Sequence, residues 1–438
     1  MIHKFKLGGF NALLDVNSGG VHIIDDLTYD LLDNVEPPFE EKCPEDVVRK
    51  LSKMYDSKDI EDCYEEIVSL YNDKILFSED DYEKYALSAV ASPIKAMCLH
   101  IAHDCNLRCK YCFASTGDFG QGRMLMDYET GKRAIDFLIE RSGDRKFLEV
   151  DFFGGEPSLN FGTVEKLVEY ARSQEEPHNK KFRFTVTTNG VHLTDEMIDF
   201  INKEMYNVVL SIDGRKEVND RMRPFRNGKG SYDLIVPKFQ KLADSRNQER
   251  YYIRGTFTRN NLDFSNDVIH FADLGFKQMS IEPVVAAPEE PYSIREEDVP
   301  QILEEYDKLA VEYIKRKKEG RGFNFFHFMI DINGGPCVAK RLSGCGSGCE
   351  YLAVTPWGDF YPCHQFVGNE DFLMGNVDDG IVRPDIRDMF KNSNVYSKEK
   401  CKNCFAKFYC SGGCAANSYN FHGNICLLYT SPSPRDCS

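Results

Sequence analysis

The chain has 438 residues, which is enough for two or three domains, and 42% of them are hydrophobic, as in an ordinary globular protein. Its formal net charge of −16 argues against nucleic-acid binding, and no run of about eighteen apolar residues predicts a membrane span. Residues 1–6 lack the apolar core of a signal peptide. We therefore expect a cytoplasmic protein that binds neither nucleic acid nor a membrane.

Residues 1 to about 90 are expected to form a separate unit. Two short apolar runs, 10–16 and 21–25, flank Asn17-Ser18-Gly19-Gly20, which predicts a hairpin. Helical spacing of apolar residues follows in three stretches: one beginning near Leu27, one over 44–54 and one over 59–71. Two strands followed by compact helices match a winged-helix plan, and the acidic composition makes DNA an improbable ligand.

From about residue 95 the pattern becomes strand, loop and helix in repetition. The predicted strands are 96–103, 147–153, 182–187, 207–212, 252–258 and 278–284. The predicted helices are 164–172, 194–202, 232–242 and 299–318, the second with Thr194 as its cap. This alternation predicts an α/β fold with a parallel sheet and helical crossovers.

Residues with unusual chemistry follow these strands. They are Cys105 to Cys112 after the first, Gly154-Gly155-Glu156-Pro157 after the second, Thr188-Asn189-Gly190 after the third and Ser211-Ile212-Asp213-Gly214 at the fourth, and Glu282-Pro283 lies in the sixth. Barrels of alternating strands and helices carry their active sites at the carboxyl ends of the strands. The sequence therefore predicts one site at this end of the sheet.

Three cysteines stand together as Cys105-x3-Cys109-x2-Cys112. Three thiolates this close can hold three irons of one [4Fe-4S] cube, which leaves the fourth iron open to bind and reduce a small molecule. The alternatives are a zinc site or a set of buried thiols. Structural zinc sites usually take four ligands from two cysteine pairs, and no fourth ligand stands nearby, since His103 is expected inside a strand.

The other cysteines also suit an intracellular chain. Sixteen cysteines in a long chain without an export signal favour metal ligands or redox groups over disulfides. Cys43, Cys63 and Cys98 stand apart and are predicted to be buried apolar fillers. After about residue 320 the chain carries Cys337, Cys345, Cys349 and Cys363, a predicted hairpin over 351–363, and then a dense metal-binding array, Cys401-x2-Cys404-x5-Cys410-x3-Cys414.

These motifs resemble the radical S-adenosylmethionine (SAM) superfamily, whose signature is CxxxCxxC after the first strand of a partial β/α barrel. The later cysteines, with Cys345-x12-Gly358-x4-Cys363, resemble a SPASM domain. Most of all, the chain resembles the maturases of six-cysteine (SCIFF, or ranthipeptide) precursor peptides. The stretches that carry this likeness are 334–341, 343–346 and 362–366, and the likeness extends over residues 1 to about 425.

The resemblance implies three domains. Residues 1–90 would be a winged-helix-like domain that recognises a leader peptide, residues 91–320 a partial (β/α)6 TIM-like barrel, and residues 321–425 a SPASM domain. The expected partners are a Cys-rich precursor peptide with its leader, held as an added strand, and a low-potential electron donor of the ferredoxin or flavodoxin type. A simple structural cap on the barrel is the alternative role for the first domain.

The resemblance also assigns residues. Cys105, Cys109 and Cys112 would hold the SAM-cleaving cluster, and Tyr111 would contact the adenine of SAM. The Gly154-Gly155-Glu156 motif would take the methionine amino group of SAM, since a carboxylate accepts from an ammonium. The remaining candidates lie near the ribose and carboxylate of SAM: Ser211, Asp213 and Arg223. For Asn189, a strand-end turn and a cofactor contact both stay open.

The implied reaction is a thioether synthesis. One electron from the cluster cleaves SAM to methionine and a 5′-deoxyadenosyl radical, which abstracts hydrogen from an unactivated carbon. Two auxiliary [4Fe-4S] clusters are implied, the first held by Cys345, Cys363 and Cys414 together with Cys349, and the second by Cys401, Cys404 and Cys410. An auxiliary cluster that binds a substrate thiolate or accepts an electron suits the coupling of a Cys sulfur to carbon.

The C-terminal end departs from the family pattern. A SPASM domain has a further cysteine after Cys414, and the chain offers only Cys426 and Cys437. The run from Cys426 to Asp436 resembles a translated sequencing-library adapter. We therefore expect residues 426–438 to be non-native and the second auxiliary cluster to be incomplete.

Two other functions are weighed against thioether synthesis. One is an anaerobic sulfatase maturase that oxidises Cys or Ser to formylglycine, which is expected to lack the N-terminal unit. The other is a non-catalytic iron–sulfur electron carrier. The Gly154-Gly155-Glu156-Pro157 run and the other strand-end motifs argue against a carrier.

Overall fold

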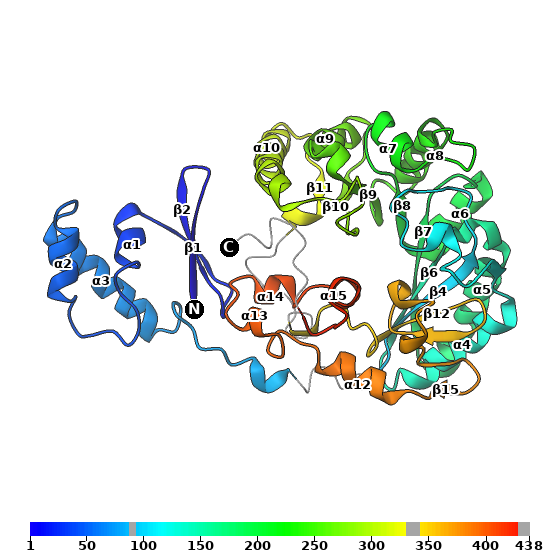
Figure 1. Cartoon of the computed structure of the whole chain (residues 1–438), viewed down its shortest axis with the longest axis horizontal. Helices are drawn as coiled ribbons and strands as arrows, with labels where there is room; N and C mark the ends of the chain where they lie inside the picture. Colours follow the sequence, from blue (N-terminus) through cyan, green and yellow to red (C-terminus); the bar gives the residue numbers. More distant parts are fainter. Residues whose placement is uncertain (87–92, 330–341, 428–438) are drawn as a thin grey trace. The chain divides into compact units, whose positions relative to one another are not determined.

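The computed structural model describes residues 1–86, 93–329 and 342–427 (Figure 1). Contacts divide the chain into two units. The small unit consists of residues 1–89, 330–344 and 394–412, and the large unit of residues 90–329, 345–393 and 413–438. The stretch 334–341, which carried part of the SCIFF likeness, and Cys437 lie outside the described residues.

The small unit contains a three-stranded antiparallel sheet in the order β1-β2-β3, followed by three helices. Their bounds are β1 (Ile2–Leu7), β2 (Phe10–Asp15), β3 (Val21–Ile24), α1 (Asp26–Leu31), α2 (Glu45–Leu51) and α3 (Ser57–Asn72). The predicted hairpin and helices are present. Strand β1 was not predicted, because its six residues include two lysines and a histidine and form no continuous apolar run.

Residues 394–412 belong to this small unit although they are distant in sequence. They carry the short helices α13 (Glu399–Lys402) and α14 (Lys407–Cys410). Asp80 accepts hydrogen bonds from Lys407 Nζ at 2.6 Å and from the Tyr396 hydroxyl at 2.5 Å, and the rings of His3 and Phe405 stack at 3.7 Å between centroids. These contacts fasten the second half of the cysteine array to the N-terminal part of the chain.

The large unit is built on one sheet whose central strands are all parallel, in the order β11-β10-β9-β8-β7-β6-β4-β12. The bounds of its main strands are β4 (Ala96–His103), β6 (Phe147–Gly154), β7 (Lys181–Thr188), β8 (Met205–Ser211), β9 (Tyr251–Phe257), β10 (Gln278–Pro283) and β11 (Asn324–Phe325). The six predicted strands and the predicted α/β class are confirmed. Short β5 (Met124–Leu125) pairs with β4 in the antiparallel direction.

The predicted hairpin after residue 350 extends this same sheet. Its strands β12 (Tyr351–Val354) and β13 (Asp359–Tyr361) are followed by β14 (Gly375–Asn376) and β15 (Gly380–Ile381), and β12 pairs in parallel with β4. The sequence did not reveal this pairing, because the register between Leu99 and Val354 depends on contacts far apart in the chain. The third cysteine region is therefore partly continuous with the barrel sheet.

Helices cover the outer side of the curved sheet (Figure 1). The helices of the large unit are α4 (Tyr128–Arg141), α5 (Phe161–His178), α6 (Asp195–Glu204), α7 (Lys216–Met222), α8 (Tyr232–Ser245), α9 (Phe264–Asp273), α10 (Val299–Lys318), α12 (Pro384–Asn392) and α15 (Ala415–His422). Thr194 caps α6 as predicted, since its hydroxyl accepts from the Met197 amide. Helices α4, α7, α9, α12 and α15 were not predicted. No helix in the described ranges is both long and apolar enough to cross a membrane.

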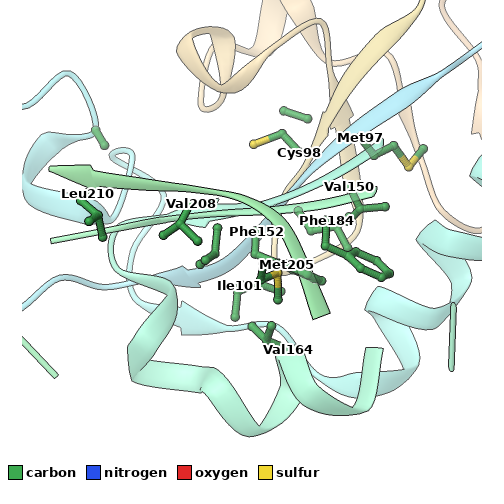
Figure 2. Close-up of a cluster of buried hydrophobic side chains, with 14 of the residues drawn as sticks. Met97, Cys98, Ile101, Val150, Phe152, Val164, Phe184, Met205, Val208 and Leu210 are labelled. Atoms are coloured by element: carbon green, nitrogen blue, oxygen red, sulfur yellow. The ribbon is translucent and has the colours of Figure 1, made fainter. Parts of the chain in front are cut away.

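Alternate residues of each strand face opposite sides of the sheet. The side toward the helices is apolar and fully buried, as Val150, Phe152 and Phe184 illustrate with Val164 of α5 (Figure 2). The opposite, inner side is more polar and only half-buried along β6, β7, β8 and β9. The inner face therefore has room for a ligand, and its carboxyl end carries the predicted site.

Candidate functional site

The three-cysteine loop follows directly from the completely buried strand β4. Its backbone is fastened to the segment after α7: the Arg108 amide donates to the Pro224 carbonyl at 2.8 Å and the Lys110 amide to the Met222 carbonyl at 2.9 Å. A buried strand and these two bonds therefore fix the loop at the carboxyl edge of the sheet, where the sequence predicted it.

The three cysteines of the loop are electrostatically close to one another. Burial, helped by the charge of Glu156 and by the neighbouring thiols, raises the pKa of Cys105 to about 12. Burial raises the pKa of Cys109 to about 11, against the lowering effect of Arg223. Such thiols ionise only with a nearby cation, and a coordinated metal supplies one.

The thiols suit a cluster better than a single ion. Among the described residues no group of three His, Cys, Asp or Glu side chains converges closely enough to hold one metal ion. An iron–sulfur cube takes each thiolate on a different iron, so its ligands need not converge on one point. The donor set of three thiols therefore fits a [4Fe-4S] cluster.

The two glycines at the end of β6 allow close packing against β4. A Cβ at Gly155 would lie 2.1 Å from the Asp104 carbonyl oxygen, and one at Gly154 would lie 2.3 Å from that of Ala102. The Glu156 amide donates to the Asp104 carbonyl at 2.8 Å. The glycines thus bring Glu156 beside the residue that precedes Cys105.

Glu156 is 1% exposed and links the ends of two strands. Its carboxylate accepts from the Ser158 amide at 3.0 Å, the Thr188 hydroxyl at 2.7 Å and the Asn189 amide at 2.7 Å. A carboxylate has about four acceptor positions, so one remains for a further donor. That this donor is the amino group of SAM stays a prediction.

Asn189 both makes a turn and approaches the cysteine loop. Its side-chain oxygen accepts from the Val191 amide at 3.0 Å, which is the expected strand-end turn. Its amide nitrogen lies 2.8 Å from the Asn106 side-chain oxygen and 3.6 Å from the Cys105 sulfur. The two interpretations of Asn189 are therefore compatible.

Tyr111, Asp213 and Arg223 form one buried network. The Tyr111 hydroxyl donates to the Asp213 carboxylate at 2.7 Å and accepts from Arg223 Nη1 at 2.8 Å. Burial raises the pKa of Asp213 to about 6, although Arg223 and the Tyr111 hydrogen bond oppose this shift. Asp213 also accepts from the Thr256 amide at 3.1 Å, so the network joins the cysteine loop to β9.

Ser211 ends β8 two residues before Asp213, and the backbone register pairs it with Arg254 of β9. It is half-buried on the inner side of the sheet. The predicted SAM-contacting residues thus come from the loop after β4 and from the carboxyl ends of β6, β7 and β8.

Three buried polar atoms at this edge have no hydrogen-bond partner among the described residues: Asn106 Nδ2, Ser158 Oγ and Arg223 Nε. Buried polar groups almost always have a partner, so such atoms point to an absent ligand with acceptor groups. The amino-acid and ribose portions of SAM carry acceptors of this kind. The residues present therefore fit SAM together with the cluster.

The later cysteines separate into two sets, one in each unit. In the large unit, burial and the neighbouring Cys414 and Cys345 raise the pKa of Cys363 to about 12. In the small unit, burial raises the pKa of Cys401 to about 11, with Lys398 lowering it and Cys410 and Cys404 raising it. These two sets are the ones that the family resemblance assigned to two auxiliary clusters.

Cys349 is buried in the large unit. Its thiol lies 3.6 Å from the Arg387 carbonyl, and burial raises its pKa to about 11, against the lowering effect of Arg387. Its role as a ligand stays a prediction.

A group of histidines beside the cysteine loop was not recognised as part of the site. His100 and His103 are both fully buried on β4 and their Nδ1 and Nε2 atoms are 3.0 Å apart. The half-buried His364, next to Cys363, stacks on Phe153 with centroids 4.9 Å apart. The alternating pattern of residues 96–103 predicted that His103 lies in a strand. No local pattern indicated that the histidines lie close to one another.

The three-cysteine loop lies within a part of the chain that is similar to a known protein family. Residues 99–253 match the sequence model of the Radical SAM superfamily. The chain is 28% identical to the uncharacterized protein MJ0907 of Methanocaldococcus jannaschii, over 72% of this chain and 96% of that protein. It is 22% identical to the radical SAM cyclopropyl synthase TigE of Paramaledivibacter caminithermalis, over 94% and 87% respectively, and 26% identical to a cysteine-type anaerobic sulfatase-maturating enzyme of Clostridium novyi, over 72% and 86%.

Solved structures share the fold. The enzyme anSMEcpe with bound AdoMet and the Cp18Cys peptide aligns with a TM-score of 0.60 at 20% identity, over 74% of this chain and 90% of that one. SuiB of Streptococcus suis bound to its precursor peptide SuiA aligns with a TM-score of 0.52 at 14% identity, over 98% of both chains. At these identities the likeness establishes the α/β fold with its mostly parallel sheet.

Proposed function

We propose that this chain, which contains a radical SAM domain and has peptide-modifying homologues, is a maturase that forms Cys-sulfur-to-carbon thioethers in a ribosomally made, Cys-rich precursor peptide. One observation carries the proposal. The three-cysteine loop lies at the carboxyl edge of the sheet beside three buried polar atoms without partners, Asn106 Nδ2, Ser158 Oγ and Arg223 Nε. This edge suits a cluster with one open iron and a polar cofactor beside it.

The roles of the residues follow from their contacts. Cys105, Cys109 and Cys112 would hold the cluster. Glu156, fixed by three donors, would present its remaining acceptor position to an ammonium group. When bound, the cluster and SAM supply a carbon radical that can remove hydrogen from an unactivated carbon.

The buried network would hold the carboxylate of the same amino-acid portion of SAM. Arg223 is 8% exposed and its Nε has no partner among the described residues, so it can donate to a carboxylate. Tyr111, through its bonds to Arg223 and Asp213, would keep the guanidinium in place next to Cys109. Ser211, at the end of β8, would complete the cradle.

Two auxiliary [4Fe-4S] clusters are part of the proposal. Cys345, Cys363 and Cys414 would serve the first, and Cys401, Cys404 and Cys410 would serve the second. The mutual effect of these thiols on one another's pKa supports both sets. A cluster that binds a substrate thiolate is what distinguishes thioether formation from a reaction at carbon alone.

A precursor peptide is the proposed substrate. The edge strand β3 pairs only with β2 within the described sheet and exposes Val21 and Ile23, so a leader could be added there as a further strand. SuiB, whose fold is similar, was solved with its precursor peptide SuiA. A ranthipeptide-like precursor with several cysteines fits the presence of an N-terminal unit, and a ferredoxin- or flavodoxin-type protein would supply the electron.

A formylglycine-generating enzyme is the second candidate, because sulfatase-maturating enzymes are among the relatives. Its substrate would also be a peptide, but the product would be an oxidised Cys or Ser without a crosslink. A non-catalytic electron carrier is the third candidate, and the unpartnered donors beside the cysteine loop argue against it.

The deciding experiment is anaerobic incubation of the iron-loaded chain with SAM, dithionite and the Cys-rich peptide encoded beside its gene. We expect 5′-deoxyadenosine and a peptide that has lost two hydrogens per crosslink and retains its sulfur. Tandem mass spectrometry would locate each crosslink. Formylglycine in the product would support the second candidate, and absence of 5′-deoxyadenosine from fully loaded protein would support the third.

A further inference from the structure

The amino end of the sheet, opposite the cysteine loop, contains a cavity of ≈ 550 Å³. Its walls come from the first residues of β6, β7, β8, β9 and β10, and its lining includes Arg183, Tyr206, Arg250 and Tyr252. An adjoining hollow of ≈ 420 Å³ shares Tyr206 and Arg250 with it and adds Arg246. None of these residues takes part in the site described above.

Three arginines gather around one tyrosine in these hollows. The guanidinium of Arg183 lies 4.8 Å from the Tyr206 ring centroid, and that of Arg250 lies 5.2 Å from the same centroid. Arg246 is held by the backbone, since its Nη atoms donate to the carbonyls of Ile201 at 3.2 Å, Met205 at 3.1 Å and Tyr206 at 3.3 Å. Burial, and then the charge of Arg250, lower the pKa of Arg246, which means that the two cations repel one another.

These arginines have no carboxylate partner among the described residues. Arg183, Arg246 and Arg250 make no ion pair there, although Glu149 and Glu249 line the same cavity. Arg183 and Arg250 lie over the same tyrosine ring and line the same cavity, so two cations without an ion pair face one space. A bound anion would remove this repulsion, because guanidinium groups pair with carboxylate or phosphate through two parallel hydrogen bonds.

The backbone that carries Arg250 is held in an uncommon conformation. Asn247, Gln248 and Arg250 have φ angles of 52°, 61° and 54°, in the left-handed region. Backbone strain of this kind is concentrated at ligand sites. Arg250, which ends this strained stretch, lines the cavity.

The cavity borders the inner face of the barrel sheet. Thr185, Asn207 and Tyr252, which line it, are inner-side residues of β7, β8 and β9, and these strands end at the cysteine loop's edge of the sheet. From Arg183 to Thr188 on β7 the distance is about 17 Å, at about 3.3 Å per residue. An extended peptide advances by the same length per residue, so about five residues would span the two ends.

We propose that this cavity binds a carboxylate-bearing segment of the substrate peptide, about five residues away from the residue that reacts at the carboxyl edge of the sheet. The assignment rests on the proposed peptide substrate. An extended acidic segment can enter a space lined by Arg183, Arg250 and the rings of Tyr206 and Tyr252. The cavity is also much larger than one inorganic anion needs.

The test uses two fluorescein-labelled octapeptides with amidated ends, one of alternating Gly and Asp and one of alternating Gly and Asn. Binding to the full-length, iron-loaded chain is followed by fluorescence anisotropy. The double variant R183Q/R250Q removes the cavity cations. The matched control R141Q removes one cation over an aromatic ring elsewhere, since Arg141 lies 5.5 Å from the Phe137 centroid.

We expect the Asp peptide to bind the wild type, and to bind it more weakly at high salt. Its affinity for R183Q/R250Q should be lower by a factor of about ten or more, because hydrogen bonds to charged groups are lost. R141Q should bind like the wild type and the Asn peptide should bind poorly throughout. Equal binding of the Asp peptide to wild type and R183Q/R250Q would overturn the proposal.

Two further measurements distinguish the shape of the guanidinium groups from their charge, and a peptide ligand from a small anion. R183K/R250K keeps the charges but loses the planar guanidinium groups. We expect its affinity for the Asp peptide to lie between those of the wild type and R183Q/R250Q, with far-UV circular dichroism and unfolding temperature unchanged.

If inorganic phosphate displaces the Asp peptide completely and itself binds with the same dependence on Arg183 and Arg250, the site takes a small anion and the peptide assignment is wrong. Formation of 5′-deoxyadenosine from SAM without peptide tests the proposed function separately.

Discussion

The thiols of Cys105 and Cys109 lie where burial opposes their ionisation, and Glu156 adds negative charge beside Cys105. In the unloaded site these thiols therefore stay protonated. Coordination to iron would deprotonate them, because the metal supplies the positive charge that burial otherwise withholds. At the scale of single residues, then, loading of a cluster is coupled to the release of thiol protons.

The first prediction concerns these ligands. Replacing Cys105, Cys109 and Cys112 together by Ala should abolish 5′-deoxyadenosine formation while the unfolding temperature changes little, since all three side chains lie in a loop and are only half-buried. Chromatography of the SAM products and thermal circular dichroism would measure the two effects. Cys43→Ala, in a cysteine that stands apart, is the control and should retain the activity. Residual cleavage above background in the triple variant would show that other groups hold the cluster.

The second prediction concerns Asp151 on the inner face of β6. Burial, with Glu149 nearby, raises the pKa of Asp151 from 3.8 to about 7. A carboxyl with a raised folded-state pKa contributes stability that is complete below about pH 4 and is lost as the pH rises through about 7. Asp151→Asn should therefore remove a pH-dependent loss of stability on the order of 4 kcal/mol, because the shift is about three pKa units at about 1.4 kcal/mol each.

Urea unfolding of the apo chain at pH 4.5, 6 and 8, conditions chosen around the window of about 4 to about 7, would test this prediction. The quantity to compare is the change in unfolding free energy with pH, because the hydrogen bond to Thr185 also changes in the variant. Parallel pH profiles for wild type and Asp151→Asn would contradict the assignment of this titration to Asp151.

The residues of the site could be predicted singly but not as a network. Local spacing and family likeness pointed to Tyr111, Asp213 and Arg223 one by one. The hydrogen bond between Arg223 and the Tyr111 hydroxyl connects residues that are 112 positions apart in the sequence, and no local pattern can indicate it. The unpartnered Ser158 and Asn106 were missed for the same reason, since an absent partner is visible only when all neighbours are known.

At the scale of elements, the junction between β4 and β6 positions the site. Gly155→Ala should disrupt it, because the added Cβ would lie 2.1 Å from the backbone oxygen of Asp104, which cannot move freely. We expect SAM affinity to fall by at least about tenfold and stability to fall by about 1–3 kcal/mol. Equilibrium dialysis with labelled SAM and urea unfolding would measure both.

Gly162→Ala in α5 is the matched control. No atom lies within 4 Å of its added Cβ, and Ala is favoured over Gly inside a helix, so stability should stay equal or rise by up to about 1 kcal/mol. Equal SAM affinity in Gly155→Ala and Gly162→Ala would mean that the glycine pair does not shape the cofactor site.

The edge strand β3 provides the test of leader recognition. Ile23 is 68% exposed there, so Ile23→Glu should change stability little. The substitution should weaken binding of the leader peptide about tenfold or more, because an apolar contact along the added strand is replaced by a charge. SAM cleavage measured without peptide should be unchanged. Isothermal calorimetry would measure the affinity. Val311→Glu, at a 69% exposed position of α10, is the control, and equal affinity in the two variants would contradict docking on β3.

The elements differ in how far sequence alone could define them. The six barrel strands and α10 were predicted because apolar residues recur with the period of each element, and α10 was predicted over its observed residues 299–318. Strand β1, helices α4, α7 and α9, and all four helices from α12 to α15 were missed. The parallel pairing of β12 with β4 depends on tertiary contact, and so no periodicity could reveal that the third cysteine region extends the barrel sheet.

At the scale of the whole molecule, the later cysteines are divided between two units of the chain. Cys345, Cys363 and Cys414 belong to the large unit, and Cys401, Cys404 and Cys410 to the small unit. If each set holds a cluster, loss of one should leave the other intact, because the two sets share no ligand. The small unit also carries β3, so its proposed cluster and its proposed leader site fold together.

The last prediction separates the three proposed clusters. Cys363→Ala and Cys401→Ala should each lower the iron content by about one cluster, about four irons, and the effects should add in the double variant. Addition of SAM to the reduced protein should alter one electron paramagnetic resonance signal, and that signal should persist in both variants and vanish when Cys105, Cys109 and Cys112 are replaced. A SAM-sensitive signal that instead disappears with Cys363 or Cys401 would place the cofactor at an auxiliary cluster, because SAM can bind only where an iron lacks a protein ligand.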